Sequence, residues 1–402
     1  MNSVISSRIK LKDFIDMLLA AICCVSCTLL VHINNSLYKI LIVLFCVLAM
    51  LVCARRKVKI EKLGFVVRWA VFVSWSLISF VWSYQITEYQ FNSAIVFLLI
   101  LVTCFVVSIY IESAEQVYLY FRMLIFSAIL LEIYIFKFYG ENMLDARFDN
   151  TVLNSNRAGI IFAVALFFCV YFYDYYRKLM DLILALFLCA GVLFSGSKSA
   201  ILFTIFSVGI FMILKNRKDI SNLIRNIMIV VAFILIIFFI ITKSYNFYNI
   251  IGERLIDFLG TLVGKQSRSV STIMRTYFLE QGIELFKERP LQGWGIYNFR
   301  YLNKYGDYAH SNIIEILADF GIVGAIFFVR IYTVIIKKML HNKNMVETDR
   351  AFVWAYMVGM LFLNFTHVYM NQLFDIIIAC LLYLFVVLNS NTDFKCKKSI
   401  KK

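Results

Sequence analysis

The sequence lacks three motifs that are typical of ATP-driven and hydrolytic proteins. It contains no G-x-x-x-x-G-K-[ST] phosphate loop, no H-E-x-x-H zinc helix and no G-x-S-x-G nucleophile turn. Their absence disfavours an ATP-driven pump.

Charged residues and proline are also scarce. Only 16% of the 402 residues are charged and one, Pro290, is proline, whereas 62% are hydrophobic and the mean hydropathy is +0.80. Soluble globular chains contain about 45–50% apolar residues. We therefore expect an integral membrane protein of the all-α class, with one polytopic transmembrane domain over residues 1–402.

Apolar runs long enough to cross a bilayer, about 20 residues each, recur along the whole chain. The first of them is span-length and has no clear small-residue cleavage pattern, so we expect a first transmembrane helix and not a signal peptide. The runs predict twelve spans near 14–32, 37–54, 64–83, 92–111, 118–137, 157–176, 179–196, 199–214, 226–243, 311–336, 350–369 and 373–390.

The net charge of +15 follows the predicted topology. Twenty-five lysines and arginines fall on one side of the predicted spans, which we expect to be cytoplasmic together with both termini. The short loops opposite contain only Lys39, Lys137, Arg147, Arg157 and Lys198. Most of the positive charge therefore sets orientation, and no nucleic-acid partner is expected.

The longest polar stretch, 244–310, is predicted to form one large extracytoplasmic loop with short helices near 247–263 and 270–289. Nine of the ten cysteines lie within or at the edge of apolar spans, and the C-x-x-C of Cys24 and Cys27 has no second pair or histidine nearby. They imply no disulfide framework or structural zinc, and no cofactor is expected. Acidic residues inside the spans are few for a proton relay, the main ones being Asp16, Glu132, Asp319 and Asp375.

Basic residues in the outward loops suggest an anionic ligand. Arg147, Lys198 and Arg275 come from three separate loops, and a cation at the membrane surface requires a partner such as a phosphate or diphosphate. Each of them alone is also explained by a lipid headgroup or a nearby carboxylate. Asp375 and His367, near the outer ends of the last two helices, belong either to the same site or to ordinary interfacial helix ends.

His310 differs from these cations because an imidazole can accept a proton near neutral pH. It stands at the start of the helix predicted in "YAHSNIIEILADFGIVG", where Ser311 or Asn312 can cap the first turn. The residue is thus either a positioned base on the outer face or an ordinary interfacial histidine.

These motifs resemble the O-antigen polymerase and O-antigen ligase superfamily of bacterial polysaccharide assembly. The family pattern H-[NSQ]-x9-G-x2-[GTY] is met by His310, Ser311, Gly321 and Gly324, and "RTYFLEQGIELFKERPLQGWGIYNF", from Arg275 to Phe299, is similar to the family run upstream of it. The turn "SGSKSAIL" is similar to the family's S-R-x3-L, with Lys198 in place of arginine. The stretch "ARFDNTVLNSNRAG" is similar to its R-x-x-G…P-N loop, without the glycine and the proline.

The resemblance implies a metal-independent membrane glycosyltransferase that uses undecaprenyl-diphosphate-linked oligosaccharides at the outer face of the bacterial cytoplasmic membrane. Arg275 and Lys198, with Arg147, would bind the diphosphate, and His310 would deprotonate or orient the acceptor hydroxyl. Gly321 and Gly324 would let their helix pack closely on a neighbour. Further substrate contacts are expected from Asn156, Trp294, Asn298 and Tyr308.

Three functions stay open at this point. A polymerase would join two lipid-linked repeat units, and a ligase would transfer the polymer to the lipid A-core of lipopolysaccharide. The segment "GWGIYNFRYLNKYGDYAHSN" favours a polymerase, and the histidine pattern favours a ligase. A flippase is a third candidate, but it would place its charges within helices and not in loops. Membrane lipids, a flippase and a chain-length regulator are the expected partners.

Overall fold

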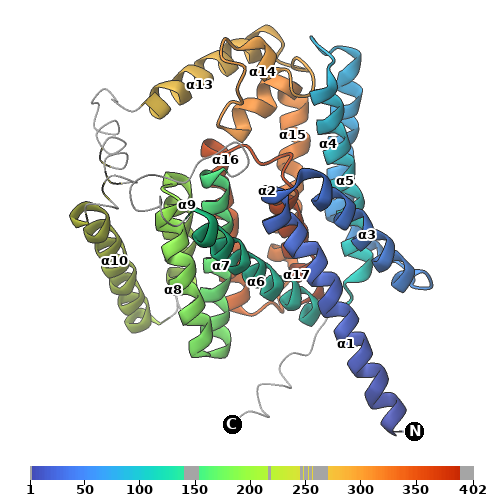
Figure 1. Cartoon of the computed structure of the whole chain (residues 1–402), viewed down its shortest axis with the longest axis vertical. Helices are drawn as coiled ribbons and strands as arrows, with labels where there is room; N and C mark the ends of the chain where they lie inside the picture. Colours follow the sequence, from blue (N-terminus) through green and yellow to red (C-terminus); the bar gives the residue numbers. More distant parts are fainter. Residues whose placement is uncertain are drawn as a thin grey trace.

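The computed structural model describes residues 2–139, 154–215, 219–244 and 270–389, together with positions 248, 252 and 256. Within these ranges every regular element is a helix, and most of the helices run side by side in one bundle (Figure 1). The all-α class predicted from the sequence is therefore confirmed.

Each of the twelve apolar runs forms a helix. The first run is built from α1, a π-helical turn (Ser26–Leu30) and the short α2 (Val31–Ile33). The principal helices are α1 (Asn2–Val25), α3 (Asn35–Cys53), α4 (Gly64–Ile78), α5 (Glu88–Tyr110), α6 (Ala114–Tyr139), α7 (Ser155–Tyr176), α8 (Leu179–Phe194), α9 (Lys198–Leu214), α10 (Ile220–Lys243), α15 (Asn312–His341), α16 (Glu347–Thr366) and α17 (Leu373–Leu388).

Seven helical stretches among the described residues are long and apolar enough to cross a membrane, so the chain is a multi-pass membrane protein. They are Leu11–Ile33, Asn35–Cys53, Ile60–Val81, Glu88–Tyr110, Ala114–Tyr139, Ser155–Tyr176 and Asn312–His341. The helices α8, α9 and α17 are apolar but shorter, and the total of twelve spans stays a prediction.

The centre of the bundle is formed by α7 and α17. Every residue of α17 from Leu373 to Leu388 is buried, as expected for a helix that is hydrophobic on all sides. Aromatic rings fill the space around α7, where Tyr171 stacks on Phe352 of α16 with ring centroids 4.1 Å apart. Side chains on the first turn of α17 are therefore enclosed by protein, whereas Asn156 and Arg157 on the first turn of α7 are partly exposed.

One end of the bundle, called the upper end here, carries α13 (Val270–Glu288) and α14 (Phe299–Leu302), and α15 descends from it (Figure 1). The predicted helix at 270–289 is thus confirmed, while the one predicted near 247–263 lies almost entirely outside the described residues. The start of α1 lies at the opposite end (Figure 1).

Basic residues at that lower end bind the last carbonyl groups of α5. Lys62 Nζ donates hydrogen bonds to the carbonyl oxygens of Ile109 and Ile111, at 3.3 and 2.8 Å, and Arg56 donates to Tyr110 O at 3.0 Å. Positive charge is favourable at a helix C-terminus because the last carbonyls there have no partner within the helix. These two cations stabilise the fold.

α15 is broken at Gly321, where φ is +64°. The segment after Pro290 lies against the break and satisfies the backbone groups that the helix leaves unpaired. The N–H groups of Trp294 and Gly295 donate to the carbonyl oxygens of Ala318 and Asp319, at 2.9 and 2.8 Å. The N–H of Ile322 in turn donates to Pro290 O at 2.8 Å.

The two glycines of the histidine motif therefore have different structural roles. A Cβ on Gly321 would collide with the backbone of Leu291 and Gln292, so this position serves the break and not, as predicted, close packing on another helix. A Cβ on Gly324 would lie 3.2 Å from Trp75 Cδ1 of α4, so the prediction of close helix packing holds at this position.

Candidate active site

His310 lies in the loop just above α15 and has a left-handed backbone with φ of +53°. Its ring lies against that of Tyr308, with centroids 4.0 Å apart, and against Phe278 of α13 at 5.7 Å. The side chain keeps 21% of its surface exposed. Two aromatic rings thus fix the imidazole without closing it off from the outside.

Asp307 is a neighbour of His310 that the sequence reasoning missed. Its Oδ2 lies 3.7 Å from His310 Nε2, too far for a hydrogen bond but close enough for an ion pair with a protonated imidazole. The interaction with His310 lowers the pKa of the Asp307 carboxyl below its usual value, so the carboxylate stays ionised at neutral pH. The sequence did contain a signal for this pair, because an acidic residue stands three positions before the histidine of the motif.

The loop that carries His310 is tied down on both sides. Glu315 Oε2 accepts a hydrogen bond from Ala309 N at 2.8 Å, and Ser311 Oγ donates to Asn364 O of α16 at 3.2 Å. Asn312 Oδ1 accepts from the backbone N–H groups of Tyr369 and Met370 in the α16–α17 connection. The residues that follow the histidine therefore join α15 to the end of α16.

Four side chains, called the His310 cluster here, lie within electrostatic range of one another at the upper end: His310, Tyr308, Arg275 of α13 and His367, which follows α16. Arg275 interacts electrostatically with Tyr308, and His367 interacts with both His310 and Arg275. The structure thus brings together the two residues to which we assigned catalysis. The sequence left open whether Asp375 and His367 belong to this site. His367 interacts with the cluster directly, and Asp375 lies on the first turn of α17.

The first turn of α7 borders the same cluster. The side chain of Asn154, which caps α7, interacts with Tyr308, and Arg157 one turn further interacts with His367. The sequence reasoning counted Arg157 only as a loop cation. Asn156, an expected substrate contact, is partly exposed on this turn.

Lys198 begins α9 directly after the Ser195–Ser197 turn. This turn packs on the first turn of α7, because a Cβ on Gly159 would meet the side chains of Ser195 and Ser197. Lys198 and Arg157 are therefore carried by two adjoining turns. Arg147 lies outside the described residues.

Two of the expected substrate contacts hold the Pro290–Phe299 segment in place. The indole Nε1 of Trp294 donates to Leu285 O at 2.9 Å, and Arg289 lies 3.9 Å above its ring. Asn298 is fully buried, and its Oδ1 accepts from Gln85 N at 3.0 Å. These contacts account for both side chains without a substrate, whereas Tyr308 lies beside His310.

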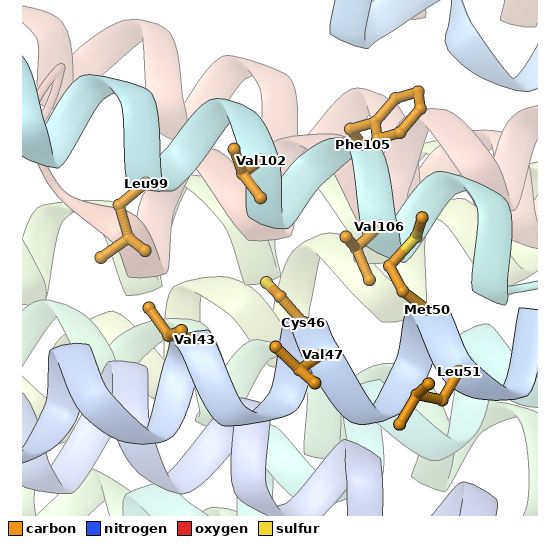
Figure 2. A pocket seen from close by; sticks show the side chains of 9 residues that line it. All are labelled: Val43, Cys46, Val47, Met50, Leu51, Leu99, Val102, Phe105 and Val106. Atoms are coloured by element: carbon orange, nitrogen blue, oxygen red, sulfur yellow. The ribbon is translucent and has the colours of Figure 1, made fainter.

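A separate groove of about 560 Å³ lies between α3 and α5, away from the His310 cluster. Figure 2 shows that its lining side chains, Val43, Cys46, Val47, Met50, Leu51, Leu99, Val102, Phe105 and Val106, all come from these two helices. Every one of them is apolar, so the groove offers no polar group for catalysis. Nowhere in the described ranges do three His, Cys, Asp or Glu side chains gather as a metal site requires.

Residues 183–329 match a family model described as O-antigen ligase. The match begins in α8, ends in α15 and includes Lys198, Arg275, His310 and both motif glycines. No curated protein sequence matches the chain. The resemblance predicted from the motifs is confirmed: over residues 183–329 the chain carries the domain of the O-antigen ligase and polymerase family, membrane enzymes that assemble lipid-linked polysaccharide of the bacterial envelope.

Proposed function

We propose that the protein is a polysaccharide polymerase, an inverting glycosyltransferase that joins undecaprenyl-diphosphate-linked repeat units at the outer face of the cytoplasmic membrane. The observation that carries the proposal is the His310 cluster. A histidine and an arginine from separate elements of the family domain lie within electrostatic reach of the same side chain, His367. A base and a phosphate-binding cation in one partly exposed site are what glycosyl transfer from a lipid diphosphate requires.

In the proposed reaction the oxygen of the acceptor hydroxyl forms a bond to the anomeric carbon of the donor. The bond between that carbon and the diphosphate oxygen breaks, and undecaprenyl diphosphate leaves. His310 accepts the hydroxyl proton, and Asp307 favours the protonated imidazole that results. Arg275 and Lys198 offset the charge that develops on the diphosphate, without a metal ion or other cofactor.

The proposed orientation places the His310 cluster outside the cell. It rests on the distribution of basic residues, since Arg56, Lys62 and most of the other lysines and arginines are expected at the lower end. A flippase that delivers the lipid-linked units and a regulator of chain length are the proposed protein partners.

A ligase is the second candidate, because the matched family model is described as O-antigen ligase. Deleting the gene separates the two functions on a gel of envelope polysaccharide. A polymerase deletion leaves a single repeat unit on the lipid carrier, whereas a ligase deletion leaves long polymer on undecaprenyl diphosphate.

Two substitutions test the site assignment. We expect His310→Ala and Arg275→Ala variants, expressed at the normal level in the membrane, to give the same short products as the deletion. Wild-type chain profiles from both variants would show that these residues do not carry the reaction.

A further inference from the structure

Arg157 carries a guanidinium for which the described part of the chain provides no hydrogen-bond or ion-pair partner. It lies on the first turn of α7, and its Nε is buried without a hydrogen bond. Among the described residues its side chain forms neither a hydrogen bond nor an ion pair. The residue is partly exposed, but an unpaired guanidinium whose Nε is shielded from water is costly, so it indicates a group that is bound there in the working protein.

Two further buried groups face Arg157 and are also incompletely satisfied. Asp375 Oδ1 on α17 and His32 Nε2 on α2 have no hydrogen-bond partner in the part of the chain that the structure describes, and each residue is only 3% exposed. Both interact electrostatically with Arg157 but do not pair with it. Asp375 therefore supplies a nearby negative charge without forming an ion pair or hydrogen bond that would occupy the N–H donors of the guanidinium.

The position of His367 links Arg157 to the His310 cluster. The charged and titratable groups with which His367 interacts are Arg157, His310 and Arg275, and none of these can carry a negative charge. Two permanently charged guanidinium groups within electrostatic range of one side chain favour an anion between them. The cations come from two different helices, α7 and α13, so a ligand between them can be held from two directions.

We propose that Arg157 is a further binding residue for the diphosphate of the lipid-linked donor, opposite Arg275, with Asp375 as its positioning residue. The inference rests on the proposed function, because it names a further residue of the same site. A diphosphate has two phosphate groups, and each planar guanidinium can bind one of them through two parallel hydrogen bonds. A lysine at position 157 would supply the positive charge but could not form two parallel hydrogen bonds to one phosphate group.

Binding of inorganic diphosphate to the purified full-length protein in detergent tests the proposal. We would compare wild type with Arg157→Gln and Arg157→Lys and follow the unfolding temperature as the diphosphate concentration rises. Arg177→Gln is the matched control, because Arg177 ends the same helix at its lower end and is 69% exposed. We expect Arg157→Gln to weaken binding at least about tenfold, Arg157→Lys to weaken it less, and Arg177→Gln to bind as wild type does.

An Arg275→Gln variant separates this inference from the proposed function. If Arg275→Gln weakens diphosphate binding and Arg157→Gln does not, Arg157 has only a structural role and the inference is overturned while the proposed function stands. If neither substitution changes binding, both are wrong.

The Asp375 carboxylate left behind in Arg157→Gln is a buried charge that can prevent folding. The double variant Arg157→Gln/Asp375→Asn removes both charges and keeps the test decisive. We expect the folded double variant to show the same loss of diphosphate binding, and wild-type binding by it would also overturn the inference.

Discussion

Asp307 and His310 form the residue pair on which the proposed chemistry depends most directly. The Asp307 carboxylate is ionised and half exposed, so its influence on the imidazole is modest. We expect Asp307→Asn to lower the transfer rate about fivefold, the ratio that corresponds to a loss of ~1 kcal/mol. The measurement is the rate of chain extension by the purified protein with a lipid-linked repeat unit.

The pH dependence of that rate distinguishes this role from a general loss of stability. The pKa of the Asp307 carboxyl lies below its usual value because of His310, so the carboxylate is lost by protonation only at a pH below the usual carboxyl range. We therefore expect the wild type to exceed Asp307→Asn at neutral pH and the difference between them to shrink only when the pH falls below the usual carboxyl range. A profile that falls uniformly at all pH values would contradict the assignment.

Lys198 stands where the family pattern has arginine. If it binds phosphate, the arginine variant Lys198→Arg retains the charge and restores the two-pronged donor, and we expect it to give wild-type chain lengths. Lys198→Ala removes the charge and should give mainly short products on the same gel. Equal profiles for the two variants would argue against a phosphate contact.

At the scale of the elements, the broken α15 is the feature with the clearest consequence for stability. In Gly321→Ala the new methyl group would collide with the backbone of the Pro290–Gly295 segment and would also force alanine into a left-handed conformation. We expect the free energy of unfolding to fall by more than the roughly 1–3 kcal/mol of the backbone strain alone. The loss of stability is measured as the decrease in the unfolding temperature of the purified protein in detergent.

Gly306→Ala is the control for that prediction. Gly306 has nearly the same φ, +67°, but the nearest atom to an added Cβ is 4.0 Å away. Only the conformational strain applies there, so Gly306→Ala should lower the unfolding temperature less. Equal losses from both variants would mean that the contact with the 290–295 segment contributes little.

The sequence predicted the elements better than the site. The helices follow from local runs of apolar residues, which is why twelve runs correspond to twelve helices among the described residues. The break at Gly321 depends on hydrogen bonds to a segment about 30 residues earlier, and no local pattern contains that information. Likewise, Arg157 comes within electrostatic range of His32 and His367 only through the tertiary arrangement of α2, α7 and α16.

For the whole molecule, we predict that the upper end of the bundle faces the outside of the cell and the lower end faces the cytoplasm. Lys304 is exposed at the upper end, near α14, and Lys59 is exposed in the connection between α3 and α4. In intact cells a membrane-impermeant maleimide should label a Lys304→Cys variant and leave a Lys59→Cys variant unlabelled. The parent protein is the control for labelling of the nine described cysteines, most of which are buried.

The left-handed backbone of His310 determines which replacement gives an interpretable result. Such a conformation is unfavourable for alanine, whereas asparagine adopts it readily. An alanine at this position therefore removes the imidazole and also disturbs the loop that leads into α15. An asparagine preserves the course of the chain, so an inactive His310→Asn protein with normal stability would assign the loss to the missing ring alone.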